Sequence, residues 1–157
     1  MPEIEPGADL PEWDVEIDIA AVDDGSEATP EDLAVGDAIR FGKTLSDADL
    51  ERFALASGDT NPLHLDDEQA GETRFGGRIA HGILTAGLIS SAVARLPGTA
   101  VYLSQDLEFR APVRPDDHVS AEIEVVEELG GDRYRFETTA EAGDETVIRG
   151  EATVLLE

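Results

Sequence analysis

An acid and a histidine stand five positions apart in the polar segment "SGDTNPLH", residues 57–64. A carboxylate and an imidazole that reach the same water molecule can remove one of its protons and deliver a proton elsewhere. Asp59 and His64 are the candidates for such a pair. Because Gly, Asp, Asn and Pro are also the commonest turn residues, the segment taken alone favours a plain turn.

A second segment, "TRFGGRIAHGILTAG", begins nine residues after His64 and offers the partner that such a pair would need. Gly76 and Gly77 allow a tight loop, and Gly82 falls where an apolar helix should begin. The first N–H groups of a helix lie at the positive end of its dipole and can stabilise an anionic oxygen. Asp59, His64 and the Gly82 N–H thus match the base, acid and oxyanion donor required to add water to an α,β-unsaturated thioester, with base and acid unassigned.

Other chemistries have weaker support in the sequence. His81 could orient the loop, but its position just before the expected helix favours a structural role, and His118 in "RPDDHVS" indicates a surface residue at a strand start. The chain has no Gly-x-Ser-x-Gly motif, and "RFGGRIAHG" lacks the strand and spacing of a nucleotide-binding loop. His64 with Asp66 and Asp67 could bind a cation, but adjacent carboxylates carry little information in so acidic a chain, and we expect no metal site.

The first helix should lead directly into the candidate segment. Ser46 followed by Asp49 is typical of a helix start, and the apolar residues after it recur at helical spacing. We expect this helix to stop near Ser57 and Gly58, since glycine can take the left-handed conformation that ends helices. Pro62 cannot continue a helix, so the candidate pair should lie in a loop.

The remaining elements predict an α+β fold. Residues 38–45 form an expected strand, and residues 83–96 form an apolar helix, buried on most sides, that "PG" ends at positions 97–98. From residue 99 onward apolar residues alternate with polar ones, with breaks at "APVRPDD", "LGGD" and "EAGDE". This pattern predicts an antiparallel meander that curls around the apolar helix.

Composition limits the classes of function. The 157 residues suit one domain, and 36 Asp and Glu against 11 Lys and Arg give a net charge of −25. Such a charge argues against nucleic acid or an anionic membrane as partner. Its self-repulsion fades in concentrated salt, where the screening length falls to about 3 Å at 1 M, so we expect a halophile's cytoplasm. The chain has no cysteine, and we find neither a secretory signal nor an apolar run long enough to span a membrane.

Residues 1–30 are rich in acids, Pro and Gly and are expected to form an N-terminal extension to a domain of residues 31–157. Within the extension, "WDVEIDIA" alternates apolar and polar residues and could add an edge strand to the sheet. We expect mobility in the rest of it.

Three ordered segments resemble the MaoC-like, (R)-specific enoyl-CoA hydratases: "FALASGDTNPLHLD", "TRFGGRIAHGILTAGLIS" and "YLSQDLEFRAPVRPDD". The resemblance covers the chain from about residue 33 onward. It implies a hot-dog fold, a homodimer with active sites near the subunit interface, and a substrate that carries coenzyme A, with no separate cofactor. The implied reaction is hydration of trans-2-enoyl-CoA to (R)-3-hydroxyacyl-CoA and its reverse, in fatty acid or polyhydroxyalkanoate metabolism.

By this resemblance, Asp59 and His64 flank the catalytic water and Gly82 donates its N–H to the thioester oxygen. Ser90, two helical turns on, would help to hold the site, and Asn61 would shape the substrate-binding loop. The sequence has "DD" at 116–117 where relatives commonly have a Gly-Asp turn. The phosphates of coenzyme A need cations, and the nearest candidates are Arg74, Arg78, Arg110 and Arg114.

Two other functions are possible on the same fold. A hot-dog thioesterase would place a carboxylate on the central helix, and residues 83–96 contain none. A non-catalytic acyl-binding or partner subunit could dispense with Asp59 and His64, so their presence in a matched motif argues against it.

Overall fold

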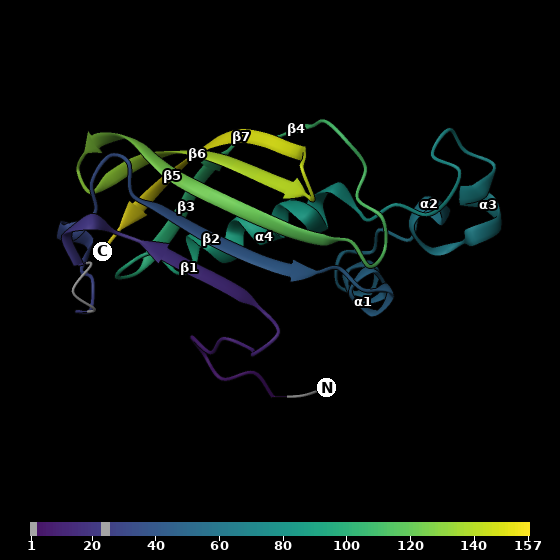
Figure 1. The fold of residues 1–157 in the computed structure, drawn as a ribbon, viewed down its shortest axis with the longest axis horizontal. Coiled ribbons are helices and arrows are strands. Elements are labelled where there is room, and N and C mark those ends of the chain that lie inside the picture. The colour runs from purple at the N-terminus through teal and green to yellow at the C-terminus, as the bar shows by residue number, and fades with distance from the viewer. Residues whose placement is uncertain (1–2, 23–25) are drawn as a thin grey trace.

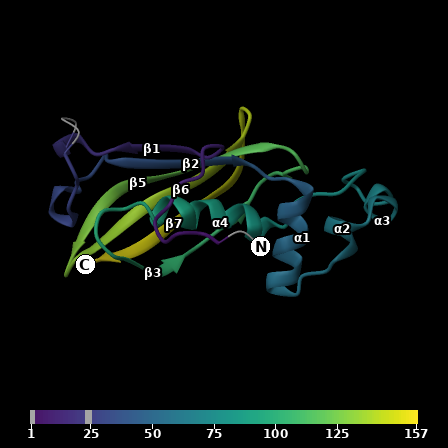
Figure 2. The same cartoon turned by 90° about the horizontal axis from the view of Figure 1, so that it is seen from below.

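The computed structural model describes residues 3–22 and 26–157. Seven strands form one sheet in the order β1-β2-β5-β6-β7-β3, with β4 paired to β7 and every pairing antiparallel. The sheet curves around the central helix α4 (Gly82–Val93), as Figures 1 and 2 show. The strands are β1 (Asp14–Asp18), β2 (Ala38–Thr44), β3 (Ala100–Gln105), β4 (Glu108–Phe109), β5 (His118–Gly130), β6 (Arg133–Ala142) and β7 (Glu145–Leu156).

The core lies between α4 and the concave face of the sheet. Strand β5 alternates buried and partly buried residues from Val119 to Val125, the period-two pattern that the sequence shows. Ile123 of β5 and Ile89 of α4 are both 0% exposed and belong to one core cluster. The predicted α+β fold, with an antiparallel sheet around one apolar helix, is therefore confirmed.

Helix α1 (Asp47–Ser57) has the predicted ends. The Ser46 hydroxyl accepts the Asp49 N–H at 3.2 Å, and the Asp49 carboxylate accepts the Ser46 N–H at 3.1 Å. Gly58 ends the helix with φ 80°, a left-handed conformation that other residues adopt at a cost. No helix in the described part of the chain combines the length and apolar character needed to cross a membrane.

Helix α4 is shorter than predicted and stops at Val93. The N–H groups of Arg95 and Leu96 bond to carbonyls three residues back, so the chain tightens into a turn before Pro97. Leu96 precedes Pro97, and the residue before a proline disfavours helical geometry. The helix therefore ends before the apolar pattern in the sequence does. One face of α4 packs on β2, β5 and β6, while Ile83 on another face is 58% exposed. The expectation of burial on most sides was too broad.

Two short helices, α2 (Pro62–Leu65) and α3 (Asp67–Gly71), replace the predicted loop. Pro62 begins α2 instead of preventing a helix, because proline suits the first helical position, where its missing N–H costs nothing. The Asn61 side chain accepts the Leu63 N–H at 3.0 Å and so caps this helix. Figures 1 and 2 place α1, α2 and α3 beyond one end of the sheet.

The N-terminal extension contributes to the domain. Strand β1 pairs along its whole length with β2 at one edge of the sheet, as "WDVEIDIA" indicates. The ring of Trp13 meets that of Phe41 edge-on at 5.4 Å, and the guanidinium of Arg95 lies over both rings. Arg95 also donates to the Asp9 carboxylate at 3.0 Å. Short 3-10 turns follow at Ala20–Val22 and Pro30–Asp32, and residues 1–2 and 23–25 of the predicted extension lie outside the described residues.

Candidate active site

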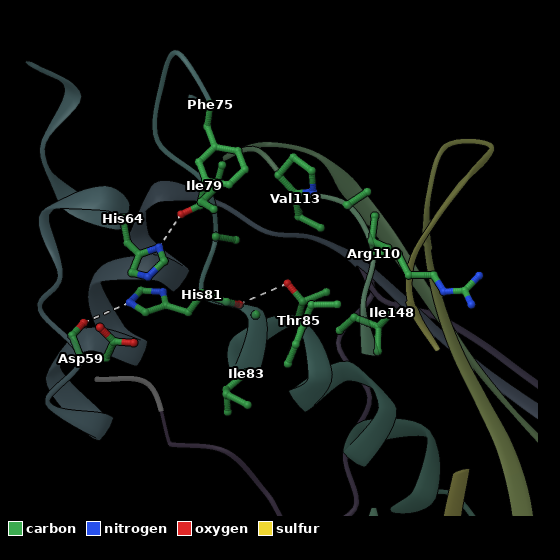
Figure 3. Close-up of a pocket in the computed structure, with 16 residues that line it drawn as sticks. Asp59, His64, Phe75, Ile79, His81, Ile83, Thr85, Arg110, Val113 and Ile148 are labelled. Atoms are coloured by element: carbon green, nitrogen blue, oxygen red, sulfur yellow. Dashed lines mark hydrogen bonds between the residues drawn. The ribbon is translucent and has the colours of Figure 1, made fainter. Parts of the chain in front are cut away.

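A pocket of about 430 Å³ lies at the N-terminal end of α4 (Figure 3). The polar side chains of its wall are those of Asp59, His64, His81, Thr85 and Arg110, and Gly82 contributes backbone. Apolar side chains form most of the remaining wall, including Phe75, Ile79, Ile83, Phe109, Val113, Val147 and Ile148. The pocket thus combines titratable groups with an apolar cavity of the kind that binds small molecules.

His64 reaches this pocket from α2 and is only 8% exposed. Its Nδ1 lies 2.7 Å from the carbonyl oxygen of Ile79. A carbonyl oxygen can only accept, so Nδ1 carries the hydrogen and donates it. In the neutral imidazole, Nε2 is therefore unprotonated and available as a base.

Asp59 lies in the turn after α1, where two local hydrogen bonds fix it. The Asn61 N–H donates to the Asp59 carboxylate at 3.3 Å, and the Asp59 N–H donates to the Ser57 hydroxyl at 3.1 Å. Asn61 does not line the pocket. Its N–H holds the Asp59 carboxylate, and its side chain caps α2, the helix that carries His64. Its predicted part in shaping the loop is seen in these contacts, whereas contact with substrate stays a prediction.

His81, for which the sequence indicated a structural role, contacts both His64 and Asp59. Its ring is 1% exposed and stacks on the His64 ring, with centroids 3.9 Å apart and planes 28° apart. Its Nε2 lies 3.1 Å from the Asp59 carbonyl oxygen and must donate to it, while Nδ1 has no hydrogen-bond partner among the described residues. Burial lowers the pKa of His81, so this imidazole is neutral near pH 7. The only hint in the sequence is its position beside Gly82.

Asp59, His64 and His81 each offer one ligand atom, and these atoms lie within 4.8 Å of one another. Ligand atoms around a tetrahedral zinc ion lie closer, at about 3.3 Å, and should converge on one point. Asp66 caps α3 and Asp67 pairs with Arg78. The two carboxylates that the sequence suggested as cation ligands beside His64 therefore already have other partners. The expectation of no metal stays a prediction.

Gly82 is the first residue of α4 and lies against the ring of Phe109. A Cβ at this position would come within 2.7 Å of that ring, so glycine permits the contact. The first N–H groups of a helix have no acceptor within it. Gly82 thus lines the pocket at the positive end of the α4 dipole, and donation from its N–H to a substrate oxygen stays a prediction.

Ser90 is not brought to the pocket by this chain. It is exposed and lines a separate depression between α4 and the N-terminal segment around Ile4 and Trp13. Its role in holding the site stays a prediction. His118 lies at the start of β5, is exposed, and contacts the Asp14 carboxylate at 2.9 Å, as expected of a surface residue.

Among the four candidate arginines, Arg110 lines the pocket. It is exposed and donates to Glu108 at 2.9 Å. Arg78 forms ion pairs with Asp47 at 2.8 Å and Asp67 at 2.6 Å, which neutralise it. Arg110 lines the pocket and Arg78 does not, so Arg110 is the better placed of the two for an anionic substrate.

Sequence comparison assigns the chain to a family. A profile described as "MaoC like domain" matches residues 32–147, most of the chain and all of the pocket's polar residues. The chain belongs to the MaoC-like family. This MaoC-like chain is 50% identical over 127 residues to the "3-hydroxybutyryl-CoA dehydratase" of Methylorubrum extorquens, covering 79% of this chain and 81% of that protein. It is 43% identical to the "(R)-specific enoyl-CoA hydratase" of Rhodospirillum rubrum, covering 80% and 90%.

Solved structures of MaoC-like hydratases share its fold. The R-hydratase PhaJ1 of Pseudomonas aeruginosa is 34% identical, with a TM-score of 0.77 over 91% of this chain and 88% of that one. The (R)-hydratase of A. caviae "involved in PHA biosynthesis" is 36% identical, with a TM-score of 0.76 over 80% and 98%. The predicted hot-dog fold and the family resemblance are confirmed.

Proposed function

We propose that the protein is an (R)-specific enoyl-CoA hydratase, which adds water to trans-2-enoyl-CoA and catalyses the reverse dehydration. The observation that carries this proposal is that Asp59 and His64 line the same largely apolar pocket. A carboxylate oxygen of Asp59 and a ring nitrogen of His64 lie at most 4.8 Å apart there. The names of the relatives support the same reaction.

The separation of Asp59 and His64 suits one bridging water, which needs hydrogen bonds of about 2.8 Å to each side. Nε2 of His64 and the Asp59 carboxylate both accept, and water has two hydrogens to donate. We assign the base to His64, because the Ile79 carbonyl holds its hydrogen on Nδ1 and leaves Nε2 free. Asp59 then orients the water through its second hydrogen.

In the proposed reaction, the water oxygen bonds to C3 of the enoyl group as its proton moves to Nε2 of His64. The electron pair of the C2=C3 bond shifts toward the thioester, and the Gly82 N–H stabilises the resulting enolate oxygen. Nε2 then returns the proton to C2, which restores the neutral imidazole. The sum is addition of H and OH across the double bond, without a separate cofactor.

The substrate can be accommodated by the rest of the pocket. Apolar side chains such as Ile79 and Ile148 would contact the acyl chain, and Arg110 would offset part of the negative charge of coenzyme A. A homodimer is part of this proposal, because the free edge strand β3 exposes Leu103 and the neighbouring region of the site exposes Phe109. The proposal also includes a cytoplasmic location and a product that enters fatty acid or polyhydroxyalkanoate metabolism.

A thioesterase of this fold is disfavoured because α4 carries no carboxylate from Gly82 to Val93. A non-catalytic subunit is disfavoured because Asp59 and His64 lie together in the pocket instead of apart.

Hydration of crotonyl-CoA and longer trans-2-enoyl-CoA esters, with the chirality of the product determined, tests the proposal. His64→Ala should lower kcat about 10²- to 10⁴-fold, the usual contribution of an acid–base group. Asp59→Asn should lower kcat about 10²-fold, because a misoriented water reacts slowly. His118→Asn is the matched control, since this histidine is exposed and contacts Asp14 away from the pocket. Wild-type rates in either site variant, or an (S)-product, would refute the assignment.

A further inference from the structure

We propose that His81 is a positioning residue for the hydration reaction: its ring fixes the His64 imidazole and its Nε2–H fixes the Asp59 turn, so that both face one water. This inference rests on the proposed function and extends it to a residue that contacts no reacting atom.

The geometry of His81 connects segments that the sequence keeps apart. It immediately precedes α4, whereas Asp59 follows α1 and His64 lies in α2. Its ring stacks on His64 at 3.9 Å, and its Nε2 donates to the Asp59 carbonyl oxygen at 3.1 Å. Phe53 of α1 supports the same ring edge-on at 4.8 Å. One side chain therefore contacts the ring of His64 and the backbone of Asp59.

A residue chosen only to fill space would not be expected here. His81 is 1% exposed, and its Nδ1 has no partner in the described part of the chain. A buried polar atom without a partner costs stability, and an aromatic hydrocarbon ring would fill the space without that cost. The hydrogen bond to Asp59 is what an aromatic hydrocarbon could not provide.

The neutral state of His81 matters to His64. The titratable groups that contact its ring, from the turn after α1 and from α2, are Asp59 and His64. Burial lowers the pKa of His81, so it adds no positive charge beside the imidazole that must accept a proton. A charged residue at this position would oppose protonation of His64 and slow removal of the water proton.

Two substitutions separate the roles of the ring and the donor. His81→Phe keeps an aromatic ring to stack on His64 and removes the hydrogen bond to Asp59. His81→Gln keeps a donor near the position of Nε2 and removes the ring. We expect His81→Phe to retain the thermal stability of the wild type, to change KM for crotonyl-CoA less than about 3-fold, and to lower kcat about 10- to 100-fold, because small misplacements of reacting groups are costly.

We expect His81→Gln to recover part of the lost kcat, and the pH profile of kcat/KM to shift in His81→Phe as the Asp59 turn loosens. A His81→Phe enzyme with wild-type kcat and pH profile would overturn the proposal. A loss of activity that follows only the loss of folded protein in both variants would also overturn it. If Asp59→Asn and His64→Ala are inactive while His81→Phe is fully active, the hydratase assignment stands and this inference alone fails.

The wild-type protein provides an independent test that needs no folded variant. Nitrogen NMR of the ring should show His81 as the Nε2–H tautomer, with a pKa below that of an ordinary histidine. A His81 that titrates near 6.5 or carries its hydrogen on Nδ1 would contradict the proposed contact with Asp59.

Discussion

Replacing Gly150 with alanine tests how strand β7 supports the pocket wall. A Cβ on Gly150 would lie 2.0 Å from the backbone oxygen of Asp106 and 2.9 Å from its backbone carbon. Ordinary contacts begin near 3.4 Å, so the loop at Asp106 must move by more than 1 Å. Two hydrogen bonds join Asp106 to β7: the Asp106 N–H donates to the Glu151 carbonyl at 2.9 Å, and the Glu151 N–H donates to the Asp106 carboxylate at 2.8 Å.

The expected destabilisation follows from those contacts. Two hydrogen bonds contribute about 1 kcal/mol each, and both lie at exposed residues, where water can replace them. Alanine regains about 0.4–1 kcal/mol because it restricts the unfolded chain. The net loss is about 1–2 kcal/mol, or a fall in Tm of roughly 2–8 °C for a chain of this size. Because β4 follows Asp106 and ends at Phe109, KM for crotonyl-CoA should rise as well.

Thermal and urea unfolding at a fixed salt concentration measure the effect on stability, and steady-state kinetics measure KM. Gly71→Ala is the matched control: it lies at the end of α3, and an added Cβ would meet nothing within 4 Å. This control should be as stable as the wild type or slightly more so, with unchanged KM. Equal stability and KM in Gly150→Ala and Gly71→Ala would show that the Asp106 loop does not rest on β7 as described.

Three further predictions concern charge and the N-terminal segment. Raising KCl from about 0.1 to 1 M shortens the screening length from about 10 to 3 Å and should increase the free energy of unfolding, since the net charge is −25; a decrease would contradict adaptation to salt. Below about pH 6.5 the unfolded chain binds a proton at His81, whereas the folded protein resists protonation because burial lowers the pKa of His81. The free energy of unfolding should therefore fall as the pH is lowered, and it should fall less steeply in His81→Gln. Asp9→Asn should lower the free energy of unfolding by about 1 kcal/mol or less and speed amide exchange at residues 4–9, because Arg95 loses its ion pair; unchanged exchange would argue against docking of this segment.

The parts of the fold that depend on local chemistry were predictable from sequence. The Ser46 and Asp49 cap, the left-handed Gly58 and the alternating strands each arise from residues close together in the chain. The Asp116 backbone has φ 72°, in the left-handed region that glycine adopts most easily and that aspartate tolerates better than most residues. In these places, propensity and the final structure agree.

The site was predictable only in part, because its decisive contacts join distant segments. Asp59, His64 and Gly82 were found from their motifs, but helix α2 was missed, since a proline can begin a helix as well as end one. His81 was assigned a structural role because no local pattern reveals a stack on a residue 17 positions earlier. Ser90 lies two turns along α4 from Gly82 and outside the pocket of a single chain, so helical spacing alone could not place it.

In the proposed reaction, the direction of proton transfer depends on the backbone more than on the identities of the two side chains. The Ile79 N–H donates to the Leu63 carbonyl at 3.3 Å, and the Ile79 carbonyl accepts the His64 Nδ1–H at 2.7 Å. These two bonds fix α2 to the segment before α4, and Gly76, with φ 67°, lets the intervening loop turn back to make them. If that loop were displaced, His64 could carry its hydrogen on Nε2, and the same residue would become a poor base for the water. In the proposed reaction, His64 can act as the base because a carbonyl 15 residues later in the chain selects its tautomer.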